Sequence, residues 1–126
     1  MTKEKSHREY IFDKVSRRSL WNQLITPPGL SSWFADDVMI DEDIYTFKWN
    51  KMEQEAQMVD MVPEQCVRYR WLEDDDEHYF EFNIHAIGLT GATSLEVVDF
   101  AIPEEQDDSI NLWDTQIDEL KRSLGI

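Results

Sequence analysis

The chain has few cysteines and few residues that break secondary structure. Its 126 residues include one cysteine, four glycines and four prolines. A single cysteine, Cys66, excludes an internal disulfide, and so little glycine and proline excludes a collagen-like or low-complexity chain. The length suits a single domain over residues 1–126, large enough to bury a core.

Positive charge is also scarce. The chain has 12 Lys and Arg against 27 Asp and Glu, a formal net charge of -15 at pH 7. A field of that sign repels phosphate backbones and anionic headgroups, so nucleic acid is not expected as a partner. No apolar run approaches the roughly 18 residues that span a bilayer, and the polar start MTKEKSHREY has no signal-peptide core. We therefore expect a cytoplasmic protein with no membrane span.

The motifs of common catalytic and metal sites are missing. The sequence contains no G-x-S-x-G elbow, P-loop or G-x-G-x-x-G. Its three histidines fall outside metal-binding spacings: His7, His78 and His85. The acidic clusters at 36–43, 73–77 and 104–108 do not match an EF-hand loop, so they are interpreted as solvated turns. No catalytic residue, metal site or cofactor is predicted.

Three segments carry helical signals. Ser16 is a good N-cap for a helix that carries Leu20 to Ile25, and the prolines after Thr26 must stop that helix because they lack the amide donor. Proline can also open a helix, so residues 28–34 are predicted to form one or two turns. From Asp108 onward a single apolar stripe predicts a long helix: Ile110, Trp113, Ile117, Leu120 and Leu124.

The rest of the chain alternates apolar and polar residues with a period of two, which is typical of antiparallel strands with one wet face. The clearest runs are DIYTFKWN (43–50), CVRYRWLE (66–73) and HYFEFNIHA (78–86). Further strands are predicted at 8–15, 37–40, 53–62 and 93–102. The predicted order along the chain is one strand, two short helices, about six strands and a long helix. This order predicts an α+β domain with the helices on one face of the sheet.

Three stretches, taken in order, carry a family resemblance: SLWNQLITPPGLSSWFADDV (19–38), AQMVDMVPEQCVRYRWLED (56–74) and LWDTQIDELKRSLGI (112–126). They resemble the START-like (SRPBCC, helix-grip) superfamily, in particular its AHSA-type branch, the homologues of the activator of the ninety-kilodalton heat-shock protein ATPase. The resemblance implies a curved antiparallel sheet of about seven strands around the long C-terminal helix, with a cavity between them. It also implies that Trp33 and Phe34 pack as a plug at one end of that cavity.

The candidate ligand-binding residues are mainly inward aromatic side chains: Trp33, Phe47, Trp49, Met58, Tyr69, Trp71, Phe80, Phe82, Asp99, Trp113 and Ile117. Such a lining suits an apolar ligand, with the Tyr69 hydroxyl and the Trp113 indole as polar groups. The alternative is a core that these rings fill completely. Asp99 either shares the cavity face with Leu95 and Val97 or lies on a β-bulge that turns it to solvent.

The leading hypothesis is non-enzymatic binding of a hydrophobic small molecule or lipid. Two alternatives follow from the resemblance. In the first, the domain is a co-chaperone-like interaction module whose acidic surface meets a basic protein partner. In the second, it is an enzyme like the polyketide cyclases or aromatases, with Asp99 or Tyr69 handling protons.

Overall fold

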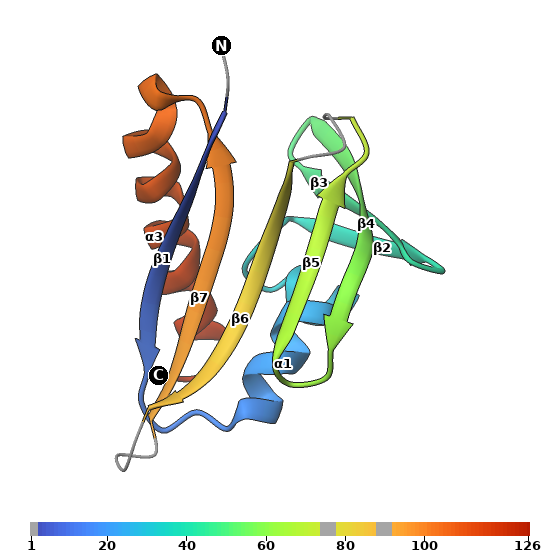
Figure 1. The fold of residues 1–126 in the computed structure, drawn as a ribbon. Coiled ribbons are helices and arrows are strands. Elements are labelled where there is room, and N and C mark those ends of the chain that lie inside the picture. The colour runs from blue at the N-terminus through green and yellow to red at the C-terminus, as the bar shows by residue number, and fades with distance from the viewer. Residues whose placement is uncertain (1–2, 74–77, 88–91) are drawn as a thin grey trace.

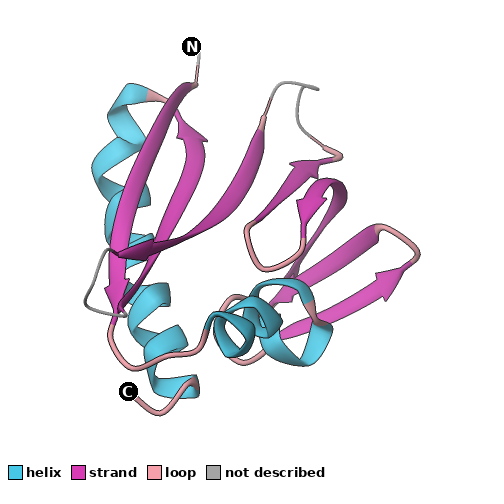
Figure 2. Ribbon diagram, turned by 60° about the horizontal axis from the view of Figure 1, so that its bottom comes forward, coloured by secondary structure: helices cyan, strands magenta, loops and turns pink. Residues whose placement is uncertain are grey.

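The computed structural model describes residues 3–73, 78–87 and 92–126, and most of the predicted acidic turn at 73–77 lies outside them. The predicted order of elements is confirmed (Figures 1 and 2). The chain runs through β1 (Glu4–Phe12), α1 (Arg17–Ile25), α2 (Pro27–Leu30), β2 (Asp37–Asp41), β3 (Ile44–Trp49), β4 (Met52–Val62), β5 (Cys66–Trp71), β6 (Tyr79–Ile87), β7 (Ala92–Ala101), η2 (Pro103–Glu105) and α3 (Gln106–Ser123).

Two predicted elements have other bounds in the structure. The first strand spans Glu4–Phe12 rather than 8–15. It cannot extend to residue 15, because Lys14 takes a positive φ of 61° that extended backbone does not allow. The second helix ends at Leu30 rather than at residue 34. The chain still turns there, since the Phe34 amide donates to the Leu30 carbonyl at 2.8 Å, but the helical run is broken.

The seven strands form one antiparallel sheet in the order β1-β7-β6-β5-β4-β3-β2. In Figure 1, α3 runs alongside β1 and β7, and Figure 2 shows the β2–β3 side of the sheet turned away from them. The register between β4 and β5 shifts between Met58 and Asp60, and such a bulge bends a strand. Within the described residues, no helix is long and apolar enough to cross a membrane.

The buried core lies between the inner face of this sheet and the helices. Most of the inward residues predicted from the alternation are buried on β3, β5 and β6: Tyr45, Phe47, Val67, Tyr69, Phe80, Phe82 and Ile84. Trp49 and Trp71, of the same inward faces, are half-buried, and Ala86 at the end of the β6 alternation is exposed. From α3, the buried residues are Trp113, Ile117 and Leu120, which belong to the predicted apolar stripe. The inner face of the sheet, which is rich in aromatic residues, therefore packs against the face of α3 that carries Trp113, Ile117 and Leu120.

The end of α1 creates an unusual demand for hydrogen-bond donors. Pro27 and Pro28 have no amide hydrogen, so they cannot close the i to i−4 bonds to the carbonyls of Gln23 and Leu24. The amide of Gly29, the next candidate donor, bonds to the Thr26 hydroxyl instead, at 3.0 Å. Three successive carbonyls therefore need donors from elsewhere.

Three aromatic side chains supply those donors. The Trp33 indole donates to the Gln23 carbonyl (2.8 Å), the Tyr69 hydroxyl to the Leu24 carbonyl (2.7 Å) and the Tyr45 hydroxyl to the Ile25 carbonyl (2.6 Å). Two of these donors come from strands β3 and β5 of the sheet and the third from the loop after α2. The bonds tie the end of α1 to the sheet and set where the short helices sit.

Gly29 allows the two short helices to approach closely. A Cβ atom added at this position would lie 2.3 Å from the Asn22 carbonyl oxygen and 2.7 Å from the Gln23 Cα atom. Both are backbone atoms that cannot move aside without shifting α1. The Pro-Pro-Gly sequence therefore stops one helix and packs the next against its end.

We expect Tyr69→Phe to lower the free energy of unfolding by about 1–3 kcal/mol, because it leaves the buried Leu24 carbonyl without its donor. The measurement is urea unfolding followed by tryptophan fluorescence. The control is Tyr79→Phe, which removes a hydroxyl that has no hydrogen-bond partner among the described residues and should cost little. Equal stability losses in the two variants would contradict the assigned role of the Tyr69 hydroxyl.

Candidate functional site

Phe34 occupies the centre of the space between sheet and helix. Its ring is stacked on Phe80 at a centroid distance of 5.3 Å and on Trp113 at 5.8 Å, and its edge contacts fall on Phe47 and Trp49. Trp33 lies beside it, with its ring 5.4 Å from Phe34. This pair fills the inner part of the predicted cavity.

The main chain of Phe34 is also held in place. Its carbonyl accepts hydrogen bonds from the Trp49 indole at 2.7 Å and from the Gln116 amide at 3.2 Å. One donor comes from β3 and the other from α3. The loop that carries the central ring is therefore fastened to the sheet and to the helix at one atom.

A pocket of about 360 Å³ remains between α3 and the sheet, next to Phe34. It is bounded by the end of β3, the start of β4, the end of β5, the end of β7 and the part of α3 from Ser109 to Gln116. Its lining is mostly apolar: Phe34, Trp49, Met52, Gln54, Trp71, Asp99, Ser109, Leu112, Trp113 and Gln116. The exposed side chains of Met52 and Leu112, 58% and 59% accessible, contribute apolar surface that reaches solvent.

The structure divides the candidate ligand-binding residues into two groups. Trp49, Trp71, Asp99 and Trp113 line this pocket. The remaining candidates are buried or half-buried in the packed core and do not line it: Trp33, Phe47, Met58, Tyr69, Phe80, Phe82 and Ile117. The core group lies directly behind the pocket, since the Phe80 ring is 4.8 Å from the Trp71 ring.

Six lining residues were not among the candidates. Phe34 was expected as a plug, and the other five were not identified from the sequence: Met52, Gln54, Ser109, Leu112 and Gln116. Four lining positions on α3, which are 109, 112, 113 and 116, recur at steps of three and four. They form a face beside the main apolar stripe, so the helical periodicity contained this signal. Nothing in the alternation of β4 distinguishes Met52 and Gln54 from ordinary strand residues.

Asp99 faces the pocket, which resolves the two alternatives for this residue. The pairing of β7 with β1 continues without a shift through Asp99, whose partner is Ser6, so the predicted β-bulge is not there. The carboxylate accepts a hydrogen bond from the Trp113 indole at 2.9 Å and one from the Phe100 amide at 2.8 Å. The Trp113 indole is thus bonded to a protein group that shares the pocket.

Tyr69 does not supply a polar group to the pocket. Its side chain is fully buried and its hydroxyl donates to the Leu24 carbonyl. Burial raises the pKa of Tyr69 far above its usual value, and Tyr45 raises it further. The hydroxyl therefore stays protonated near neutral pH, which makes Tyr69 a poor acid-base group.

The described residues hold no cluster of three or more His, Cys, Asp or Glu side chains able to bind a metal ion. Two of the three histidines, His7 and His85, are exposed, and the third is half-buried. Within the pocket lining described above, Asp99 is the one ionisable side chain. The site can therefore offer apolar surface, aromatic rings, one carboxyl group and the neutral polar side chains of Gln54, Ser109 and Gln116.

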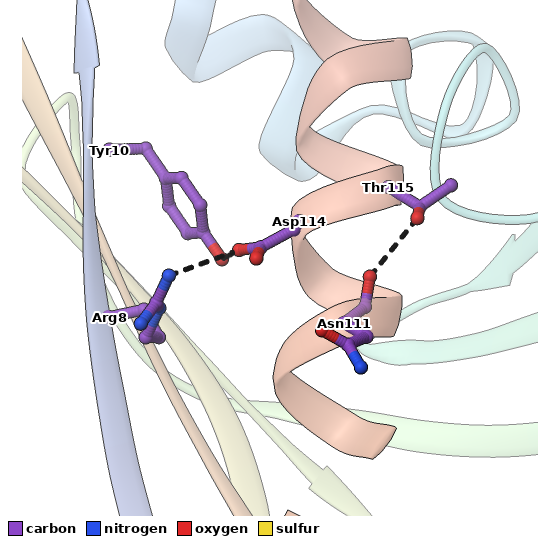
Figure 3. Close-up of polar contacts among 5 residues, drawn as sticks. All are labelled: Arg8, Tyr10, Asn111, Asp114 and Thr115. Carbon is purple, nitrogen blue, oxygen red and sulfur yellow. Dashed lines mark hydrogen bonds and ion pairs between the residues drawn. The ribbon is translucent and has the colours of Figure 1, made fainter. Parts of the chain in front are cut away.

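A polar cluster holds α3, which forms one wall of the pocket, against β1 (Figure 3). The Tyr10 hydroxyl donates to the Asp114 carboxylate at 2.7 Å, and the Arg8 guanidinium approaches the same oxygen at 3.4 Å. Burial raises the pKa of Tyr10 to about 12, and its bond to Asp114 contributes in the same direction. The Gln106 amide also donates to the Glu4 carbonyl at 3.1 Å, which fixes the start of α3.

Comparison with known proteins identifies related folds. The model of the START-like superfamily domain matches residues 1–126. The solution NMR structure of BfR322 from Bacteroides fragilis shares 39% identity and a TM-score of 0.71 over 100% of this chain and 94% of that one. The Aha1 dimer from Colwellia psychrerythraea shares 16% identity and a TM-score of 0.80, over 98% of this chain and 97% of that one. No curated protein sequence matches the chain.

We expect Tyr10→Phe to change how stability depends on pH. In the unfolded chain the tyrosine ionises near its usual value of 10.0, and in the folded chain at about 12. Neutral Tyr10 therefore contributes stability below pH 10.0, and that contribution is lost as the pH rises through about 12. The variant should lose free energy of unfolding less steeply over this window, as measured by urea unfolding at a series of alkaline pH values.

Tyr79→Phe is the matched control for this experiment, because Tyr79 contacts Arg68 and Phe100 rather than α3. It should keep the alkaline slope of the original chain. A Tyr10→Phe variant with an unchanged slope would contradict the coupling of Tyr10 ionisation to the seating of α3.

Proposed function

This chain belongs to the START-like superfamily, and from that premise we propose that it binds an apolar small molecule in the pocket between α3 and the sheet, without a chemical step. The observation that carries the proposal is the pocket of about 360 Å³ with three tryptophans in its lining. That volume lies within the range of small-molecule sites, at its lower end. The ligand would be a compact molecule with an aromatic or short alkyl body.

The composition of the walls supports an apolar ligand. The half-buried rings of Trp49 and Trp71 and the exposed Leu112 side chain provide apolar surface, and the largely buried rings of Phe34 and Trp113 complete the lining. A ligand that covers such surfaces gains about 25 cal/mol of binding free energy per Å² of apolar area removed from water. Because the indoles of Trp49 and Trp113 are already hydrogen-bonded within the protein, their rings are fixed before binding, which reduces the entropy lost on association.

The filled core behind the pocket limits the size of the ligand. Phe47, Phe80 and Phe82 have no accessible surface, and the Phe34 ring closes the path toward them. A ligand would therefore sit at the α3 side of the aromatic core rather than inside it. A long lipid chain would need Phe34 to move, although its carbonyl accepts hydrogen bonds from the Trp49 indole and the Gln116 amide.

We expect Ser109→Phe to weaken binding of the neutral probe neopentylbenzene about tenfold or more, since a ring at this lining position fills part of the pocket. Isothermal titration calorimetry measures the affinity, and circular dichroism confirms that the variant is folded. Thr115→Phe is the control, because Thr115 is exposed on α3 and does not line the pocket. Gln54→Phe should reproduce the effect from the opposite wall.

Two results would overturn the proposed function. One is a failure of apolar and amphiphilic probes of every charge to bind the original chain. The other is binding that Ser109→Phe and Gln54→Phe leave unchanged, which would place the probe elsewhere. Native mass spectrometry of the protein from its own host provides a further measurement, because a stoichiometric apolar passenger supports the proposal and identifies the ligand class.

A further inference from the structure

We infer that the ligand carries a positively charged ammonium group that lies between Asp99 and the tryptophan rings of the pocket. The inference rests on the proposed function and names the class of ligand: an amphiphilic cation with an apolar body. Three independent features of the pocket support it, namely the acid, the ring faces and the surrounding charge.

The first feature is the position of the carboxylate. Asp99 is half-buried on β7 among apolar lining residues, and it is the one ionisable group in the described lining. Its two oxygens are held in place by the Trp113 indole and the Phe100 amide, at 2.9 and 2.8 Å. A carboxyl group accepts hydrogen bonds and, as a carboxylate, attracts cations, so a ligand group beside it is favoured when it is a donor or a cation.

The second feature is the arrangement of aromatic faces around the same space. Trp49 and Trp71 lie with ring centroids 6.5 Å apart, and Trp113 is stacked with Phe34 at 5.8 Å. Tryptophan is the best of the aromatic side chains at attracting a cation over its face. A quaternary ammonium, which cannot donate a hydrogen bond, can use the ring faces and the carboxylate charge together.

The third feature is the field around the pocket mouth. A neighbouring depression shares Ser109 and Leu112 with the pocket, and its lining includes Glu105 and Asp108. The first turn of α3, whose positive dipole end would otherwise favour anions, carries Asp107 and Asp108. With a net charge of -15 over the chain, the local and global fields both concentrate cations and repel anions.

The experiment compares two probes of nearly the same shape. Benzyltrimethylammonium carries the charge, and neopentylbenzene is its neutral carbon isostere. We expect the original chain to bind the cation about tenfold more tightly than the isostere. In Asp99→Asn, which keeps an oxygen able to accept from the Trp113 indole, the preference should fall to near unity while neopentylbenzene still binds.

Asp118→Asn is the matched control, because it removes the same charge from an exposed position of α3 outside the pocket lining. It should keep the preference for the cation. Two outcomes would overturn the inference and leave the proposed function standing. In one, the original chain binds the two probes with equal affinity. In the other, Asp99→Asn and Asp118→Asn lose the preference for the cation equally. Failure of both probes to bind the original chain would overturn this inference, and failure across the wider probe panel would remove the proposed function as well.

Discussion

Three main-chain carbonyls at the end of α1 have to be satisfied by side chains that are distant in the sequence, and the arrangement of the domain depends on this. The two prolines that follow Thr26 remove the amide donors that the carbonyls of Gln23 and Leu24 would otherwise use. An unsatisfied buried carbonyl costs about 1–3 kcal/mol. Trp33, Tyr69 and Tyr45 meet the requirement, so the aromatic core and the helix end specify each other's positions.

This requirement also explains why the pocket lies at the α3 side of the core. The hydroxyls of Tyr45 and Tyr69 point toward α1, so their rings are held on the inner face of β3 and β5, where they pack against Phe47 and Phe80. Phe34 then fills the centre, with its carbonyl bonded by the Trp49 indole and the Gln116 amide. The unfilled space that remains is bounded by α3 and the ends of β3, β5 and β7.

The fold could be predicted from the sequence because its signals are local. The period of two in 43–50, 66–73 and 78–86, the Ser16 cap and the stripe from Ile110 to Leu124 each depend on neighbouring residues alone. The site could be predicted only in part. Alternation placed Tyr69 and Trp71 on one inward face, but it did not indicate that Tyr69 serves the end of α1 while Trp71 reaches the pocket. That difference depends on where another element ends, which periodicity does not encode.

Asp99 combines packing and polarity in one side chain. A carboxylate on an apolar wall is costly unless it is hydrogen-bonded, and here the bond from the Trp113 indole also fixes the position of α3 against β7. The group that gives the pocket its charge is therefore one of the groups that seat its helical wall. Asp114, which does not line the pocket, helps to seat the other side of α3, where it accepts a hydrogen bond from the Tyr10 hydroxyl. The helix is therefore fastened on two sides, to β7 through Asp99 and to β1 through Asp114.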